Sequence, residues 1–287
     1  MLVRQASRRL ALLGLICLLA AGCQSSAGAA PLAGTPTPTT SAAGGGTFTE
    51  AVAGIAGYLN PLFADEDNAR EINSLVYQGL TQVGGDQQMK PLLAREIRLS
   101  ADHLTYSAML RTDVMWADGL PFTAEDVRFT FAVLQDPNYT APEAATWKGV
   151  TVKKVADDRV DFTLKSPSAG FLNSLRIGII PQHLFPGEVT TIPGSPYSGA
   201  KAIGTGPFMI ESISADRSVV TLRRNPYATP SPHLDRIMFK SYSSLDGAVS
   251  AVAGGLADAV GGVLSTAEAR TLERPDVRVI DLRTFSF

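Results

Sequence analysis

Cysteine is nearly missing from this sequence. Only Cys17 and Cys23 occur among the 287 residues, and both stand close to the N-terminus. Beyond them the chain has no thiol, so it can form no disulfide, no cysteine-ligated metal site and no cysteine nucleophile.

Histidine is also scarce. The three histidines, His103, His183 and His233, stand far apart, and none has the spacing of a metal-ligand motif such as H-E-x-x-H. No G-x-S-x-G elbow occurs. The Gly-Thr-Gly at 204–206 lacks the full dinucleotide-binding pattern and precedes a predicted strand, so it is a very weak phosphate signal. We therefore expect no enzyme activity, no metal and no cofactor.

An excess of positive charge is absent too. Arg4, Arg8 and Arg9 are the only charged residues among the first 22, which leaves 22 basic and 27 acidic residues in the rest. Aromatic residues make up 7% of the chain and do not alternate with basic ones in the way that base-stacking surfaces require. This balance argues against a nucleic-acid partner.

The N-terminus has the form of a secretion signal. The basic stretch "MLVRQASRRL" leads into the apolar "LALLGLICLLAAG", which is shorter than the roughly 20 residues of a membrane-spanning helix. Its end, "LLAAGC", resembles a lipoprotein signal-peptidase site, although Ala20 stands where Leu is preferred. We predict that residues 1–22 are a signal peptide and that Cys23 carries acyl chains, which would hold the exported protein at the outer face of the cell membrane.

The next segment has a different composition. Residues 24–46 consist mainly of Gly, Ala, Ser, Thr and Pro and cannot bury enough apolar surface to fold. We expect residues 23–46 to be a lipidated, disordered tether and residues 47–287 to be the folded domain.

Strands and helices are predicted in an irregular order in the folded region. No regular alternation of strand and helix is found, so the class is α+β, or irregular α/β. The expected elements are a strand from residue 47 with a turn at 60–61, a helix over 68–80, three hairpins turning at 101–102, 157–158 and 215–216, a strand over 234–242, a Gly-interrupted helix over 245–260 and a closing strand over 276–287.

Three acids stand within nine residues of each other, at Asp118, Glu125 and Asp126. Thr123 followed by Asp126 resembles a capping box at a helix start, where the helix dipole also favours Glu125. Catalysis by carboxyl groups needs two of them held in different environments, and nothing nearby provides that. The pattern favours a helix cap over a catalytic cluster.

Four segments, taken in order, resemble the family 5 solute-binding proteins of ABC importers. "WADGLPFTAEDVRFTF" is similar to that family's DG-x-PFTAEDV segment, and "IGTGPFMIESI" to its GTGPY strand, with Phe208 in place of Tyr. "LRRNPYATPSPHLDRIMFKSYSS" resembles the NP-x-Y…LD-x-I-x-F segment, with Tyr227 directly after Pro. "LDGAVSAVAGGLADAV" resembles a helix ending GEIDV. The resemblance covers about residues 47–287.

The resemblance implies the first lobe of a two-lobe, type II periplasmic-binding-protein fold, which closes on its ligand by a hinge motion. It also implies a lipoprotein that captures oligopeptide-like cargo, or another small solute, and delivers it to ABC permease subunits in the membrane. Family members are much longer, so we expect the second lobe to be absent from this chain. The alternative is a truncated lipoprotein that binds a partner protein and takes no part in transport.

Ligand contacts follow from the resemblance only loosely. In the family, a bound ligand's backbone often pairs as an added strand beside the first strand and the crossing strand. For Tyr58 and Trp147, ordinary packing is an equally good explanation. For Glu50, the alternative is a position at a solvated strand edge. The candidate positions are Glu50, Ala51, Val52, Tyr58, Asn60, Trp147, Thr284, Phe285 and Ser286.

Overall fold

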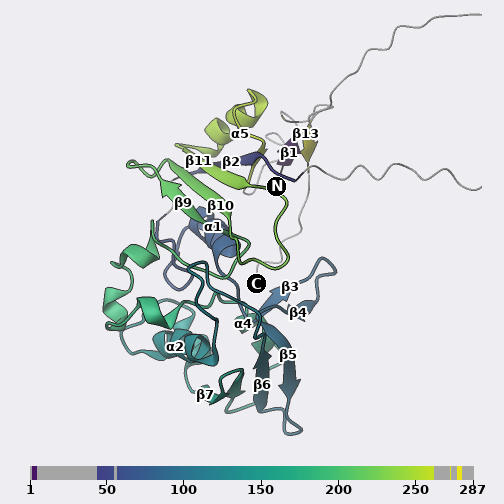
Figure 1. The fold of residues 1–287 in the computed structure, drawn as a ribbon, viewed down its shortest axis with the longest axis vertical. Helices are drawn as coiled ribbons and strands as arrows, with labels where there is room; N and C mark the ends of the chain where they lie inside the picture. Colours follow the sequence, from purple (N-terminus) through teal and green to yellow (C-terminus); the bar gives the residue numbers. More distant parts are fainter. Residues whose placement is uncertain (1, 5–43, 55–56, 262–271, 273–276, 280–287) are drawn as a thin grey trace, which may run out of the picture.

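Three β-sheets and a few helices form the part of the chain that the structure describes (Figure 1). The structure is a computed structural model, and it describes residues 2–4, 44–54, 57–261, 272 and 277–279. Strands and helices follow one another irregularly, so the predicted α+β class is confirmed. Most of the predicted signal peptide and tether lies outside the described residues.

The largest sheet has seven strands in the order β13-β1-β12-β2-β11-β10-β9. Its middle strand, β2, runs parallel to both of its neighbours, whereas the other pairs are antiparallel. The strands are β1 (Leu2–Arg4), β2 (Thr47–Ala53), β9 (Phe208–Ile213), β10 (Val219–Arg224), β11 (Arg236–Tyr242), β12 (Ala259–Val260) and β13 (Val277–Val279). Of the predicted closing strand, only β13 lies within the described residues.

The second sheet has four antiparallel strands in the order β5-β6-β8-β7. They are β5 (Ala94–Leu99), β6 (Thr105–Leu110), β7 (Thr151–Ala156) and β8 (Arg159–Thr163), and β3 (Thr81–Val83) pairs separately with β4 (Met89–Pro91). All three predicted hairpins are present. Val155 of β7 is exposed at the point where the register of the β7–β8 pair shifts, between Lys154 and Ala156.

The helices are short. They are α1 (Asp67–Val76), α2 (Ala124–Gln135), α3 (Ala144–Trp147), α4 (Phe171–Ser174) and α5 (Leu245–Ala253), with 3-10 turns at Gln182–Leu184, Val189–Thr191 and Pro196–Ser198. Within the described ranges, no helix is both long and apolar enough to cross a membrane. Helix α5 covers the seven-stranded sheet and α2 covers the four-stranded sheet (Figure 1).

Helix α1 lies between the two larger sheets in Figure 1 and ends earlier than its sequence suggests. Its last residue is Val76, whereas the sequence predicts a helix that continues to residue 80. The Val76 carbonyl accepts a hydrogen bond of 2.8 Å from the Gly206 N–H. A Cβ atom at Gly204 or Gly206 would collide with carbonyl oxygens of this helix end. The Gly-Thr-Gly therefore seats a helix end, and no phosphate role is needed to explain it.

The predicted capping box at the start of α2 is confirmed. The Thr123 hydroxyl accepts from the Glu125 N–H at 3.2 Å, and the Asp126 carboxylate accepts from the Thr123 N–H at 2.9 Å. Asp126 is buried, and its other oxygen accepts from the Gln182 N–H at 2.9 Å. Glu125 pairs with Arg128, and Asp118 bonds the His183 ring at 2.8 Å. Each of the three acids thus has a structural partner.

The cap gives a graded stability prediction. Thr123→Ala should lower the free energy of unfolding by about 1 kcal/mol, the usual cost of losing a cap. Asp126→Ala should cost about 3 kcal/mol, because it leaves the N–H groups of Thr123 and Gln182 without an acceptor. Glu125→Gln, the control, should cost about 0.3 kcal/mol. Urea unfolding measures all three, and equal losses for Asp126→Ala and Glu125→Gln would contradict this account.

Candidate ligand-binding site

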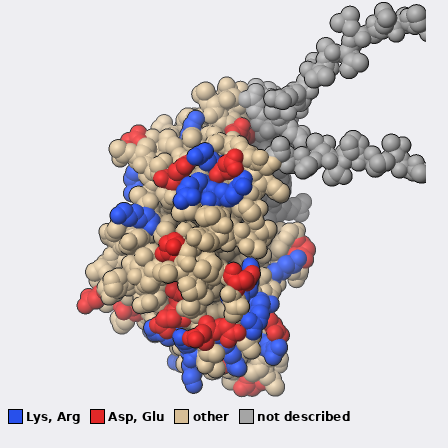
Figure 2. Space-filling model, viewed as in Figure 1, with Lys and Arg blue, Asp and Glu red and all other residues tan. Residues whose placement is uncertain are grey.

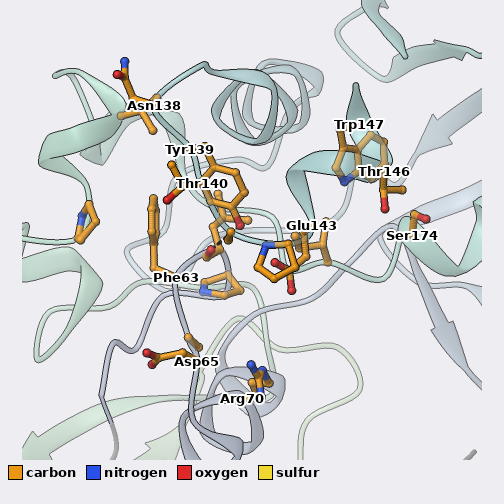
Figure 3. A pocket seen from close by; sticks show the side chains of 18 of the residues that line it. Phe63, Asp65, Arg70, Asn138, Tyr139, Thr140, Glu143, Thr146, Trp147 and Ser174 are labelled. Atoms are coloured by element: carbon orange, nitrogen blue, oxygen red, sulfur yellow. Dashed lines mark hydrogen bonds between the residues drawn. The ribbon is translucent and has the colours of Figure 1, made fainter. Parts of the chain in front are cut away.

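A groove of about 690 Å³ runs beside the N-terminal end of α1 (Figure 3). Three segments that are distant in sequence form its walls: the turn before α1, the loop that leads through α3, and the region from α4 to the second 3-10 turn. This volume lies in the range of small-molecule sites. The labelled lining residues are Phe63, Asp65, Arg70, Asn138, Tyr139, Thr140, Glu143, Thr146, Trp147 and Ser174.

The groove combines an aromatic wall with charges of both signs. Phe63 and Tyr139 meet edge to face with their ring centroids 5.5 Å apart, and the Tyr139 hydroxyl donates to the Leu62 carbonyl at 2.6 Å. Arg70 supplies a guanidinium, and Asp65 and Glu143 supply carboxylates. Such a surface can contact apolar side chains and opposite charges together.

A second hollow of about 480 Å³ adjoins the groove and shares Arg70 and Glu143 with it. Asn73 of α1 lines this hollow and is buried, yet neither its amide nitrogen nor its amide oxygen has a hydrogen-bond partner among the described residues. An unpaired buried amide costs roughly 1 to 3 kcal/mol. A bound polar group would recover that cost. Sequence reasoning missed Asn73, because nothing in its neighbourhood sets it apart from an ordinary helix residue.

The predicted ligand residues near the groove have mixed positions. Trp147 lines the groove but is almost fully buried, and its ring centroid lies 4.3 Å from that of Phe131. Asn60 is completely buried, and its side chain bonds Ser198 and the Leu62 N–H, each at 3.0 Å. Both residues shape the walls from within. Tyr58 is 46% exposed and is not among the residues that line the groove.

The remaining predicted positions lie apart from the groove. Glu50 and Ala51 pair with β11 on one side and with β12 on the other, and Val52 pairs with β11. All three are buried, so β2 has no open edge at Glu50 and Ala51 for a ligand backbone, and Glu50 is not at a solvated strand edge. Cys23, Thr284, Phe285 and Ser286 lie outside the described residues.

Glu50 instead faces Glu71 of α1 in a separate cavity of about 370 Å³. The other lining residues are Phe48, Ser74, Leu75, Leu234 and Ile237. Burial, followed by the nearby Glu71 carboxylate and a hydrogen bond to it, raises the pKa of Glu50 to about 8. Burial also raises the pKa of Glu71. The pair therefore holds a proton near neutral pH.

The raised pKa of Glu50 predicts how stability depends on pH. Folded Glu50 binds a proton up to a pKa of about 8, whereas the unfolded chain releases it near 4.5. The folded state thus binds more protons in this interval, and its stability should fall as pH rises from 5 to 8. Glu50→Gln should flatten this fall, as measured by urea unfolding at several pH values.

The control for this test is Glu96→Gln. Glu96 pairs with Arg98 at the surface, which lowers the pKa of Glu96, so its contribution to stability is constant above pH 5. This variant should keep the wild-type slope. An unchanged slope in Glu50→Gln would contradict the protonated pair.

Outside this cavity, charged groups mostly pair at the surface. Figure 2 shows blue and red side chains gathered over the lower, four-stranded sheet and again over the seven-stranded sheet. The pairs include Arg95–Asp158 and Arg98–Glu96 in the first group and Arg236–Glu211 in the second. Among the described residues, no group of three or more His, Cys, Asp or Glu side chains could hold a metal ion.

The arrangement of the sheets is that of the periplasmic binding proteins, over about one lobe of that fold. Residues 88–286 match the sequence model of a protein family, the bacterial extracellular solute-binding proteins, family 5 Middle. The chain therefore belongs to this family, as the four sequence segments indicated.

Two proteins of known sequence illustrate the relationship. The oligopeptide-binding protein AppA of Bacillus subtilis is 25% identical over 215 residues, which are 74% of this chain and 40% of AppA. The probable peptide-binding protein YejA of Agrobacterium fabrum is 32% identical over 199 residues, which are 66% of this chain and 31% of YejA. The chain spans less than half the length of these relatives.

Solved structures give the same relation. AppA from Bacillus subtilis in complex with a nonapeptide superposes with a TM-score of 0.70 at 25% identity, over 75% of this chain and 43% of AppA. NikZ from Campylobacter jejuni in complex with Ni(L-His) gives 0.67 at 27% identity, over 75% of this chain and 43% of NikZ.

Proposed function

We propose that this chain is the solute-binding component of an ABC importer, which captures oligopeptide-like cargo outside the cytoplasm and delivers it to permease subunits in the membrane. The observation that carries this proposal is the match of the family 5 model over residues 88–286. AppA was solved in complex with a nonapeptide, and AppA and YejA are described as an oligopeptide-binding and a probable peptide-binding protein. These relatives favour a peptide over other solutes as the cargo.

The chemistry of the groove agrees with such cargo. A short peptide carries an ammonium group, a carboxylate and apolar side chains. Asp65 and Glu143 can attract the ammonium group, Arg70 can bind the carboxylate in a bidentate manner, and Phe63 can pack against a side chain. We therefore propose that the groove binds its cargo without a chemical reaction.

The proposal includes export and lipidation. Cleavage before Cys23 would leave acyl chains on that residue and tether the domain near the permease. Cleavage would also remove β1, whose Val3 pairs with Ala259 of β12 and with Arg278 of β13. In the processed protein, the facing edges of β12 and β13 would then be open to another strand.

Arg70 provides the test of peptide capture. Its side chain is about half exposed, at 54%, and among the described residues its ion pair is with Asp67 at 3.0 Å, so Arg70→Ala should fold normally. The variant should bind a mixed tripeptide library about tenfold more weakly than the wild type in calorimetric titration, because a charge-assisted bond is worth about 1.5 kcal/mol or more.

The matched control for Arg70→Ala is Arg98→Ala, which removes an exposed arginine on β5, away from the groove. It should leave peptide affinity unchanged. Equal affinities for both variants would contradict binding in the groove. Capture of a partner protein, with no peptide bound by the wild type, would favour the non-transport alternative.

Cys23 provides the test of anchoring. Cys23→Ala should move the protein from the membrane fraction to the soluble fraction, or leave it unprocessed, and should abolish labelling with palmitate. Cys17→Ala is the control, because Cys17 stands inside the predicted signal peptide and would be removed with it. A Cys23→Ala protein that still incorporates palmitate and stays membrane-bound would contradict lipidation at this residue.

A further inference from the structure

We propose that the hollow adjoining the groove binds the C-terminal carboxylate of a short peptide, and that Arg176 selects cargo with a free C-terminus. The inference rests on the proposed capture of peptides and adds a direction to it: the amino end of the cargo lies in the groove, and its carboxylate end lies in the hollow. The hollow has a volume of about 480 Å³. It shares five lining residues with the groove, Pro61, Ala64, Arg70, Glu143 and Ile177.

One face of α1, with the residue that caps its C-terminal end, forms one wall of the hollow. Arg70, Ser74 and Tyr77 stand at i, i+4 and i+7, so their side chains lie on the same side of the helix. Residues 176–178 form another wall. This segment packs closely against the end of the helix, because a Cβ atom on Gly178 would stand only 2.9 Å from the Tyr77 Cβ atom. The two walls are therefore fixed relative to each other.

The charged residues that the two spaces do not share have opposite signs. Asp65 lines the groove and not the hollow, and Arg176 lines the hollow and not the groove. Arg70 and Glu143 line both spaces, and together they contribute no net charge. The hollow is therefore the more positive of the two spaces. This difference favours a zwitterionic peptide that places its ammonium group in the groove and its carboxylate in the hollow.

The Arg176 guanidinium is held in place and keeps most of its donors. Its Nη1 atom donates to Asn173 Oδ1 at 3.0 Å, and Asn173 lines the groove, so the guanidinium lies near the border between the two spaces. Among the described residues, the Arg176 side chain has no other hydrogen-bond partner and no ion pair. A guanidinium carries its N–H donors in a planar fork that suits bidentate binding of a carboxylate.

The Glu143 carboxylate lies on the side of the hollow that faces the groove. Burial, together with the nearby Glu143 carboxylate, raises the pKa of the Tyr139 hydroxyl, and Tyr139 lines the groove and not the hollow. Glu143 can therefore accept from an N–H group of the cargo at the border of the two spaces. Arg176 is then the charge that meets the carboxylate beyond it.

Calorimetric titration of the purified 287-residue chain with the peptide Ala-Phe-Ala and with its C-terminal amide, at constant ionic strength, tests the proposal. The wild type should bind the free acid about tenfold more tightly than the amide, because the amide loses a charge-assisted pair. Arg176→Gln should bind the acid about tenfold more weakly for the same reason and should bind the amide as the wild type does. The preference for the acid should therefore disappear, whereas a merely structural role of Arg176 would weaken both peptides equally.

Two further variants complete the test. Arg98→Gln, on β5, removes an exposed arginine away from both spaces and should keep the wild-type preference for the acid. Asp65→Asn should weaken Ala-Phe-Ala but not its N-acetyl form, which has no ammonium group to lose.

The outcomes separate this inference from the proposed function. Equal affinities of the wild type for the acid and the amide, or equal weakening of both by Arg176→Gln, would overturn the carboxylate site and leave peptide capture standing. Failure of the wild type to bind either peptide would overturn both.

Discussion

The C-terminal end of α1 packs against the Gly-Thr-Gly loop at residues 204–206. The positions of the groove and of the cavity between β2 and α1 both depend on this contact. The Val76 carbonyl, left without a partner where the helix ends, accepts the Gly206 N–H, and the Asn225 side chain holds the Gly206 carbonyl at 2.8 Å. Backbone and helix approach so closely that only glycine fits at positions 204 and 206. The helix axis is thereby fixed between the two larger sheets.

The fixed helix presents different chemistry on its two sides. Arg70 lines the groove and the adjoining hollow, whereas the next residue, Glu71, lines the cavity behind β2. A rotation of the helix would exchange these environments, burying a guanidinium beside Glu50 or exposing the carboxyl pair. Because buried charge is expensive unless it is paired, the register of α1 sets the electrostatics of both places together.

Local patterns predicted the elements well and the sites poorly. The hairpins, the capping box at Thr123 and the family were readable because each depends on residues close in sequence. The end of α1 was not, since the Val76 stop is imposed by a loop 128 to 130 residues further along, at Gly204 and Gly206. The groove was missed for the same reason: its walls come from three distant segments. Glu50 looked like a residue at a strand edge until the structure placed a strand on each side of it.

The central claim, that a peptide binds in the groove beside α1, can be tested most directly by amide hydrogen exchange on the intact chain with and without a saturating peptide. The account predicts slower exchange in the wall segments, at residues 61–65 and 138–147, where the groove is lined. Exchange in β5 and β6 should not change. Protection confined to strands outside the groove, or none at all in a chain saturated with peptide, would contradict it.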